Sequence, residues 1–230
     1  MPDGASALSL ILAGDPSLYA IVRLSLFVSL SATVLAAFVG LPLGAALALV
    51  HFPGRTFIVV ITNAFMGLPP VVVGLVVFLL LSRSGPLGFL GILFTPQAMI
   101  VAQALLVLPI IAALSRQTIE DLWVEYRDEL TAMRVPPASR VATLLWDARF
   151  SLVTTLLAGF GRAAAEVGTV MIVGGNIDGF TRTMTTAIAL ETSKGDLPLA
   201  IGLGFLLIAL IVAVNAAAWG VRRIGELRAG

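Results

Sequence analysis

The sequence predicts an all-α transmembrane protein with about five membrane-spanning helices, and two observations support this fold class. The 230 residues are 59% hydrophobic and only 12% charged, with a mean hydropathy of +1.04, whereas soluble domains carry about 25% charged residues. Residues 24–50, 56–82, 84–115 and 197–221 contain no Asp, Glu, Lys or Arg, and about 20 apolar residues are enough for a helix to cross a bilayer. We therefore expect residues 1–230 to form a single membrane domain.

Turn and breaker residues divide this domain into elements. In chain order the five predicted spans are residues 17–50, 56–81, 96–114, 150–173 and 198–221. Asp15-Pro16-Ser17 is typical of a helix start, and Gly40-Leu41-Pro42 predicts a kink or the water boundary of the first span. Gly67-Leu68-Pro69-Pro70 predicts a break or kink in the second span, before the turn-rich loop at residues 85–88.

Later elements follow from similar signals. Pro96 suits the first turn of the third span, and Gly174-Gly175-Asn176 ends the fourth. Residues 183–191 can form a helix too short to cross the bilayer, and Arg222-Arg223 should stop the fifth span.

Basic residues favour one orientation, with the N-terminus outside and the C-terminus in the cytoplasm. Nine arginines then lie inside, at positions 55, 116, 127, 134, 140, 149, 222, 223 and 228, against Arg23, Arg83, Arg182 and Lys194 outside. An excess of Lys and Arg in cytoplasmic loops is the usual bias of membrane proteins. Residues 116–149 are thus expected in the cytoplasm and residues 174–197 on the opposite side.

The segment at residues 116–149 holds eleven of the 27 charged side chains. Residues 119–133 are rich in helix formers, Pro136-Pro137 should stop this helix, and Ser139 is expected to cap a second helix over residues 140–147. Helix, sharp turn and helix can fit a groove of a soluble partner, although a charge run by itself is more often an ordinary solvated loop.

This segment resembles the cytoplasmic coupling loop of ABC-importer permeases, whose pattern is Glu-Ala-Ala, three residues, then Gly-Ala. Ala132 fits the second position, and Ala138-Ser139-Arg140 fit the stretch after the glycine. Thr131 replaces the acid and Pro137 replaces the glycine. The resemblance implies contact with an ATPase subunit through Thr131, Ala132, Met133, Arg134, Pro136, Pro137, Ala138 and Ser139.

A second resemblance covers nearly the whole chain. It rests on FGRAAAEVG at residues 160–168, VGGNI at 173–177, GFTRTMTTAI at 179–188, LPPVVVG at 68–74 and GPLGFL at 85–90. This combination is similar to the tungstate ABC transporter permease family, which is close to the molybdate permeases. Molybdate permeases have a phenylalanine after the glutamate and one glycine before the asparagine, so Val167 and Gly174-Gly175 favour tungstate.

The resemblance implies the type I ABC-importer permease fold and an importer of tungstate, with molybdate or another oxyanion as the alternative. It also implies a multi-pass protein of the cytoplasmic (inner) membrane, and because five spans make a poor complete pathway, we expect a homodimer. The implied partners are a second copy, cytoplasmic ABC ATPase subunits, an extracytoplasmic oxyanion-binding protein and the lipid bilayer, without nucleic acid. ATP and Mg would bind to the ATPase, and no cofactor or metal is expected on this chain.

Polar residues near the fourth span are the candidates for the pathway or gate. Arg162 and Glu166 are four residues apart and can pair on one helix face, either as part of a gate or as a packing ion pair. The glycines permit close helix approach, and the hydroxyls and amides offer neutral donors to a dianion, unless they simply form a polar outer loop. The candidates are Pro69, Pro70, Glu166, Gly168, Gly174, Gly175, Asn176, Thr181, Arg182, Thr183 and Thr185.

Other functions fit the sequence less well. The chain lacks a Gly-x-x-x-x-Gly-Lys-Ser/Thr loop, so we expect a non-catalytic subunit that depends on a separate ATPase. An ATP-independent secondary transporter usually has interior carboxylates, and Glu166 is the only interior acid of the predicted spans. An intramembrane hydrolase would need a nucleophile and a base at depth, yet the sole histidine, His51, lies at a predicted boundary.

Overall fold

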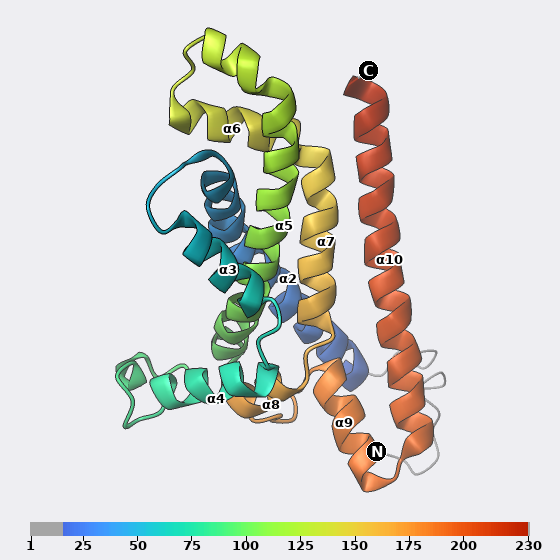
Figure 1. Ribbon diagram of the computed structural model, residues 1–230. Helices are drawn as coiled ribbons and strands as arrows, with labels where there is room; N and C mark the ends of the chain where they lie inside the picture. Colours follow the sequence, from blue (N-terminus) through green and yellow to red (C-terminus); the bar gives the residue numbers. More distant parts are fainter. Residues whose placement is uncertain (1–15, 230) are drawn as a thin grey trace. The chain divides into compact units, whose positions relative to one another are not determined.

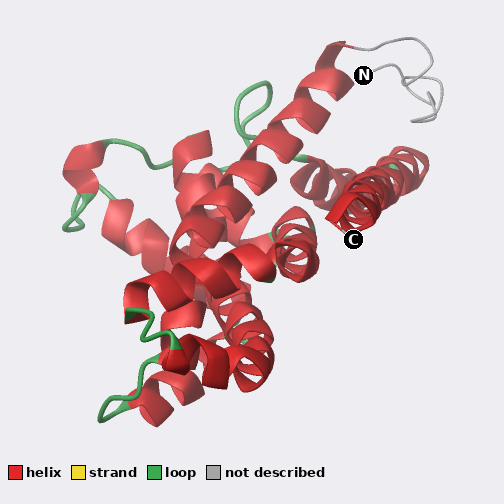
Figure 2. Ribbon diagram, turned by 90° about the horizontal axis from the view of Figure 1, so that it is seen from above, coloured by secondary structure: helices red, strands yellow, loops and turns green. Residues whose placement is uncertain are grey.

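The computed structural model describes residues 16–229, and every regular element in this range is a helix (Figures 1 and 2). The elements are α2 (Pro16–Leu49), α3 (Arg55–Phe65), α4 (Pro70–Leu81), the 3-10 turn η1 (Gly88–Leu90), α5 (Pro96–Ala132), α6 (Pro137–Asp147), α7 (Arg149–Ala164), α8 (Gly168–Gly174), α9 (Met184–Lys194) and α10 (Leu197–Ala229). The prediction of an all-α protein is confirmed for this part of the chain.

Two long helices, α2 and α5, match the first and third predicted spans at their starts. Helix α2 continues through Pro42 to Leu49, so the Gly40-Leu41-Pro42 sequence does not end it. Helix α5 begins at Pro96 as predicted and runs through Pro109 to Ala132. The first helix predicted in the charged segment is therefore the direct continuation of the third span.

The second predicted span is broken into α3 and α4, which meet at an angle of 103° (Figure 1). Pro69 is the N-cap of α4 and Pro70 its first residue, where a missing N–H costs no helical hydrogen bond. Each half has 11 or 12 residues and reaches only about 17 Å, against the roughly 30 Å of the hydrocarbon core. The predicted break is confirmed, and it is larger than a kink.

The prediction of one continuous fourth span over residues 150–173 is wrong. Helix α7 ends at Ala164, and α8 begins at Gly168. Glu166 lies in the break, where its carboxylate accepts the Thr169 N–H. That bond needs an N–H group without an i−4 carbonyl partner, which the first turn of a new helix provides.

Two smaller predictions are also corrected. Ser139 does not cap the second helix of the charged segment, because α6 begins at Pro137 with Pro136 as its N-cap. Arg222 and Arg223 do not stop the last helix, since α10 continues to Ala229 and arginine is a good helix former. The predicted short helix is confirmed as α9, which Thr183 and Thr186 start with a reciprocal pair of side-chain caps.

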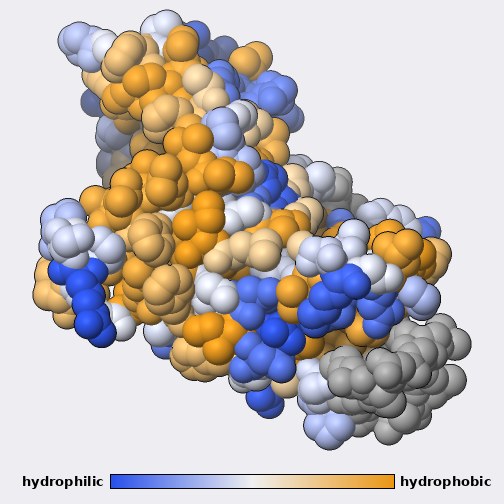
Figure 3. Space-filling view, turned by 90° about the horizontal axis from the view of Figure 1, so that it is seen from below, coloured by the Kyte–Doolittle hydropathy of each residue, from blue (hydrophilic) through white to orange (hydrophobic). Residues whose placement is uncertain are grey.

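Three helices are long and apolar enough to cross a membrane: α2, α5 and α10 up to Gly220. The count rises to five if the bent pairs α3–α4 and α6–α7 each form one span. Figure 3 shows apolar side chains over much of the face in view, and large apolar residues such as Phe38 are exposed, in that case to 82%. Such surfaces are stable against lipid, not against water.

The chain folds as two compact units. The first comprises residues 1–32, 69–103 and 161–215, of which residues from 16 onward are described. One of its cores joins the start of α2 to α9 and α10, through Leu18, Ile21, Met184, Ala187, Leu199 and Leu203. Its other core joins α2, α4, α5 and α8, through Val28, Val77, Leu81, Ala98, Met99, Ala102, Val170 and Val173.

The second unit comprises residues 33–68, 104–160 and 216–230. Its core consists of Ala45, Ala48, Ile119, Leu130, Leu144, Ala148 and Leu152, from α2, α5, α6, α7 and the residue between α6 and α7. Helices α2 and α5 cross closely here: a Cβ atom on Gly44 would lie 2.0 Å from Ser115 Oγ and 2.4 Å from the Ala112 carbonyl oxygen. Only glycine fits at this crossing.

Candidate functional site

The break between α7 and α8 carries a buried carboxylate. Glu166 is 3% exposed and lies 2.6 Å from Arg162 Nη1 through Oε2. Its other oxygen, Oε1, accepts the Thr169 N–H at 2.9 Å. The predicted pair of Arg162 and Glu166 is confirmed, but the glutamate belongs to a helix break instead of a continuous helix face. Both oxygens are satisfied, as a buried carboxylate requires.

Helices α4 and α8 lie side by side (Figure 1). The break between α3 and α4 at Pro69-Pro70 therefore lies next to the break between α7 and α8. Thr169 Oγ1 donates to the Pro70 carbonyl at 2.7 Å, and a Cβ on Gly74 would lie 2.9 Å from Thr169 Cα. Gly168 packs against Val71. The structure thus brings four predicted residues, Pro69, Pro70, Glu166 and Gly168, into one contact region between two short helices.

The predicted threonines are buried, and most already have protein partners. Thr185 Oγ1 donates to the Glu166 carbonyl at 2.8 Å, and Thr181 Oγ1 donates to the Gly174 carbonyl at 2.6 Å. Thr183 Oγ1 lies 3.2 Å from the hydroxyls of both Thr185 and Thr186. In this state they hold the loop between α8 and α9 against the break, so they offer few free donors to an anion.

The glycines and the asparagine shape the end of α8. Gly174 packs on Met99, and Gly175 ends the helix at a φ of +72°, a value at which glycine carries no steric cost. Asn176 follows at a φ of +50°. Its Oδ1 atom is buried and has no hydrogen-bond partner among the described residues.

Sequence reasoning missed a polar residue of α5 that reaches this break. Gln103 is 3% exposed, and its Nε2 donates at 2.9 Å to the Ala163 carbonyl near the end of α7, which also accepts the Glu166 N–H. Its Oε1 has no partner among the described residues. The available signal was a lone amide within an uncharged apolar run, a pattern typical of interhelical hydrogen bonding.

Gln103 borders a small polar cavity of about 10 Å³ in the first unit, roughly the space of one water molecule. The lining residues are Ser25, Ser29, Gln103, Ala164, Thr183, Met184 and Thr185. Ser25 Oγ accepts the Met184 N–H at 2.7 Å, which fastens the start of α9 to α2. The neutral hydroxyls and amide form a polar layer next to the break.

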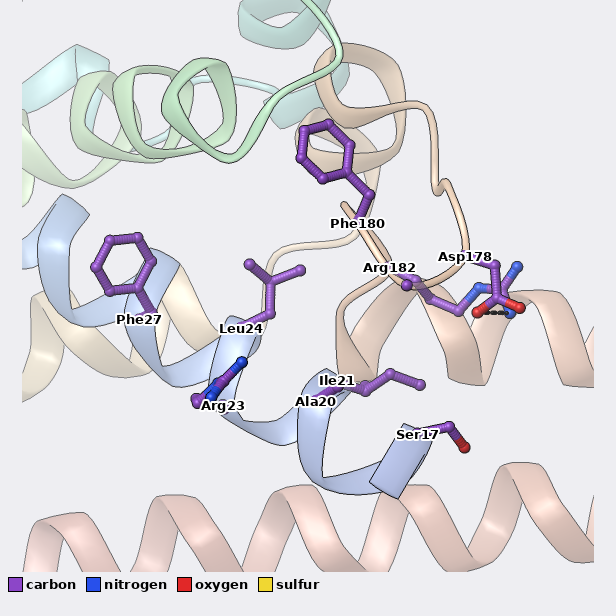
Figure 4. A pocket seen from close by; sticks show the side chains of 10 residues that line it. Ser17, Ala20, Ile21, Arg23, Leu24, Phe27, Asp178, Phe180 and Arg182 are labelled. Atoms are coloured by element: carbon purple, nitrogen blue, oxygen red, sulfur yellow. Dashed lines mark ion pairs between the residues drawn. The ribbon is translucent and has the colours of Figure 1, made fainter. Parts of the chain in front are cut away.

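Arg182 lies in a larger cavity of about 350 Å³, with Arg23 also in its wall (Figure 4). Its Nη1 atom is 2.9 Å from Asp178 Oδ1. The cavity lies between the start of α2 and the loop at residues 178–182, outside the contact region of α4 and α8.

The predicted coupling residues form an exposed turn in the second unit. Thr131 and Ala132 end α5, Met133 and Arg134 turn the chain, and α6 starts at Pro137. Arg134 has a φ of +52°, and the Val135 N–H donates to the Leu130 carbonyl. All eight predicted residues are exposed, including Met133 at 73%.

Side chains beneath this turn hold it in place. Arg140 Nε donates to the Val135 carbonyl at 2.7 Å, and its guanidinium lies 5.5 Å from the centre of the Trp123 ring. On α5, Glu120 binds Arg116 and also Arg55 at the start of α3. The exposed turn is therefore a fixed projection, which a docking element requires.

No family model matches the sequence, but curated proteins do. A probable anion ABC transporter permease of Haloferax volcanii is 44% identical over 204 residues, covering 86% of this chain and 88% of that protein. The tungstate uptake permease TupB of Peptoclostridium acidaminophilum is 39% identical and covers 94% and 95%. TupB of Campylobacter jejuni is 38% identical and covers 91% and 87%.

The chain belongs to the tungstate ABC transporter permease family. Relatives with molybdenum or sulfate transport names are more distant, at 25–28% identity. The permease is an integral membrane protein, as its apolar helices require. Among the described residues, no three His, Cys, Asp or Glu side chains gather as metal ligands.

Proposed function

We propose that this permease is the membrane subunit of an ABC importer for tungstate, and that a separate ATPase supplies the energy. One observation carries the proposal: a tungstate uptake permease is 39% identical along 94% of the chain. Molybdate is the second candidate substrate, because a molybdenum transport permease is 28% identical over 177 residues. The chain itself is non-catalytic and needs no bound cofactor, since ATP and Mg bind to the ATPase.

The exposed turn from Thr131 to Ser139 is the docking element for the ATPase in this proposal. It has the required properties: it projects from a packed core and carries an apolar side chain, Met133, in solvent. Closure of two ATPase subunits would move this turn. The turn follows the end of α5, and the same helix carries Gln103, which bonds to the end of α7 at the α7–α8 break. A binding protein outside the cytoplasmic membrane delivers the anion.

The break between α7 and α8 is the proposed gate region. Gln103 of α5 and Thr185 of α9 donate to backbone carbonyls at this point, and Arg162 in the last turn of α7 pairs with the carboxylate. Such a break can adopt a second arrangement at moderate cost, because side-chain hydrogen bonds supplement the backbone bonds that hold it. Two copies of the chain, related by a two-fold axis, would complete the pathway.

The test is tungstate uptake into proteoliposomes that contain the permease with its ATPase. The binding protein and tungstate are supplied on the side of the membrane opposite to the ATPase. We expect uptake only when ATP is supplied to the ATPase side. Molybdate in the same assay ranks the two substrates. Equal uptake by the permease alone, without ATP, would identify an ATP-independent transporter and refute the proposal.

A further inference from the structure

We propose that the cavity between α2 and the residue 178–182 loop is an oxyanion site that Arg23 and Arg182 form together. Its ligand is a tetrahedral oxyanion group, either a dissolved dianion such as tungstate or the phosphate of a lipid headgroup. For the dissolved source, this inference rests on the proposed function, since it takes the transported anion as the ligand.

The two arginines supply an excess of positive charge. Both line the cavity of about 350 Å³, on opposite walls: Arg23 comes from α2 and Arg182 from the loop (Figure 4). Asp178 is the only carboxylate among the described residues that line the cavity. Among the described residues, Arg23 has no ion pair or hydrogen bond, so its charge is available to a ligand. The described residues of the lining therefore carry a net charge of +1.

Asp178 holds Arg182 only weakly. Its side chain is 77% exposed, and ion pairs with exposed partners contribute about 0–1 kcal/mol. It contacts Nη1, while the Nε atom of Arg182 is buried and has no hydrogen-bond partner among the described residues. An unsatisfied buried donor costs free energy, so an acceptor that hydrogen-bonds to Nε of Arg182 would be stabilising.

An oxyanion can provide that acceptor. Arginine binds oxyanions through two parallel N–H···O bonds, and the Nε and Nη2 groups on one edge of Arg182 form such a pair. Because Nε is shielded in the present conformation, the guanidinium must turn from Asp178 toward the cavity. Asp178 therefore competes with the anion for Arg182.

Apolar side chains complete the site. Ile21, Leu24, Phe27 and Phe180 line the same cavity, and they reduce the local dielectric, so charges attract more strongly than in open water. Cavities of this size hold small ligands. An arginine that must turn to bind and a carboxylate that competes for it fit a site that captures an anion and releases it again.

The experiment uses the full chain in nanodiscs of phosphatidylcholine and measures bound tungsten by equilibrium dialysis against sodium tungstate. We expect R23Q and R182Q each to weaken tungstate binding at least tenfold. R182K should weaken it as well, because lysine cannot form the bidentate pair of hydrogen bonds that arginine forms. D178N should tighten binding several-fold, a gain that misfolding cannot produce. R83Q removes an exposed arginine outside the cavity and is the matched control.

A second arm uses nanodiscs with phosphatidylglycerol and native mass spectrometry to count retained lipid. Loss of tungstate binding in R23Q and R182Q with unchanged lipid retention identifies the dissolved anion. Loss of retained lipid, with no tungstate bound in phosphatidylcholine, identifies the headgroup phosphate. The inference is overturned if both variants leave tungstate and lipid unchanged, or if R83Q has the same effect. ATP-dependent tungstate uptake by the wild-type transporter is measured in parallel. Absence of uptake would refute the proposed function but not the oxyanion site.

Discussion

At the residue scale, Glu166 determines the local structure around it. A carboxylate buried away from water is costly unless it has partners, and the chain offsets this cost with a guanidinium and a backbone N–H. The backbone N–H is available because α7 has ended. A carboxylate that sequence reasoning treats as one half of an ion pair is therefore also the group that starts α8.

We predict that Glu166→Ala lowers the free energy of unfolding by about 2–3 kcal/mol, because Thr169 N–H and Arg162 lose their acceptor together. Glu166→Gln keeps one oxygen for Thr169 and should lose about half as much. Denaturant titration of both variants in detergent, followed by circular dichroism, provides the measurement. If Glu166→Ala unfolds at the wild-type midpoint, the carboxylate does not stabilise the break.

At the element scale, helix crossings depend on missing side chains. Gly44 allows α2 to contact the backbone of α5. A hydrogen bond from Ser115 Oγ on α5 to the Gly40 carbonyl on α2 also joins the two helices. The sequence showed glycines four residues apart at Gly40 and Gly44, but it could not indicate which helix they meet.

Gly44→Ala should destabilise the permease by about 1–3 kcal/mol, because the new methyl group overlaps the Ala112 carbonyl, which belongs to the backbone and cannot rotate away. The matched control is Gly204→Ala on α10, where a Cβ meets no atom within 4 Å; it should be neutral or slightly stabilising. Thermal unfolding in detergent compares the two. Equal melting temperatures would mean that the crossing adapts freely.

The turn between α5 and α6 leads to a prediction about coupling. Ala132→Glu or Ala138→Glu should leave the fold intact, because both positions are exposed, yet reduce tungstate uptake per ATP hydrolysed at least several-fold. Serine at each position is the control, since it adds little volume and no charge. Uptake and ATP hydrolysis are measured in the same proteoliposomes. Wild-type ratios in both glutamate variants would exclude this turn as the docking element.

At the scale of the whole molecule, topology can be tested directly because the chain has no cysteine. Asp128→Cys on α5 and Ser193→Cys on α9 both place a thiol at an exposed position. We expect Asp128→Cys to react with an impermeant maleimide only in inside-out vesicles, and Ser193→Cys only in intact cells. Labelling of Asp128→Cys from outside the cell would reverse the proposed orientation and remove the ATPase docking site.

The sequence predicts the long helices well, since apolar run length alone determines which segments enter lipid. The starts of α2, α5 and α10 fall within one residue of the prediction. The α7–α8 break escapes prediction because its partners, Gln103 and Thr185, come from other parts of the chain. The cavity with Arg23 and Arg182 likewise requires two segments about 160 residues apart, which no local pattern relates.

Both helices of the close crossing in the second unit contain a proline, Pro42 in α2 and Pro109 in α5. Each proline leaves the carbonyl four residues earlier without its usual N–H partner and weakens the helix there. Gly40 and Gly44 lie within one turn of Pro42, and the residues they approach, Ile111, Ala112 and Ser115, lie within two turns of Pro109. Helices α2 and α5 are therefore packed tightly together near the positions where a proline makes each helix easiest to bend. This crossing has the arrangement of a pivot, with a flexible point in each helix beside it.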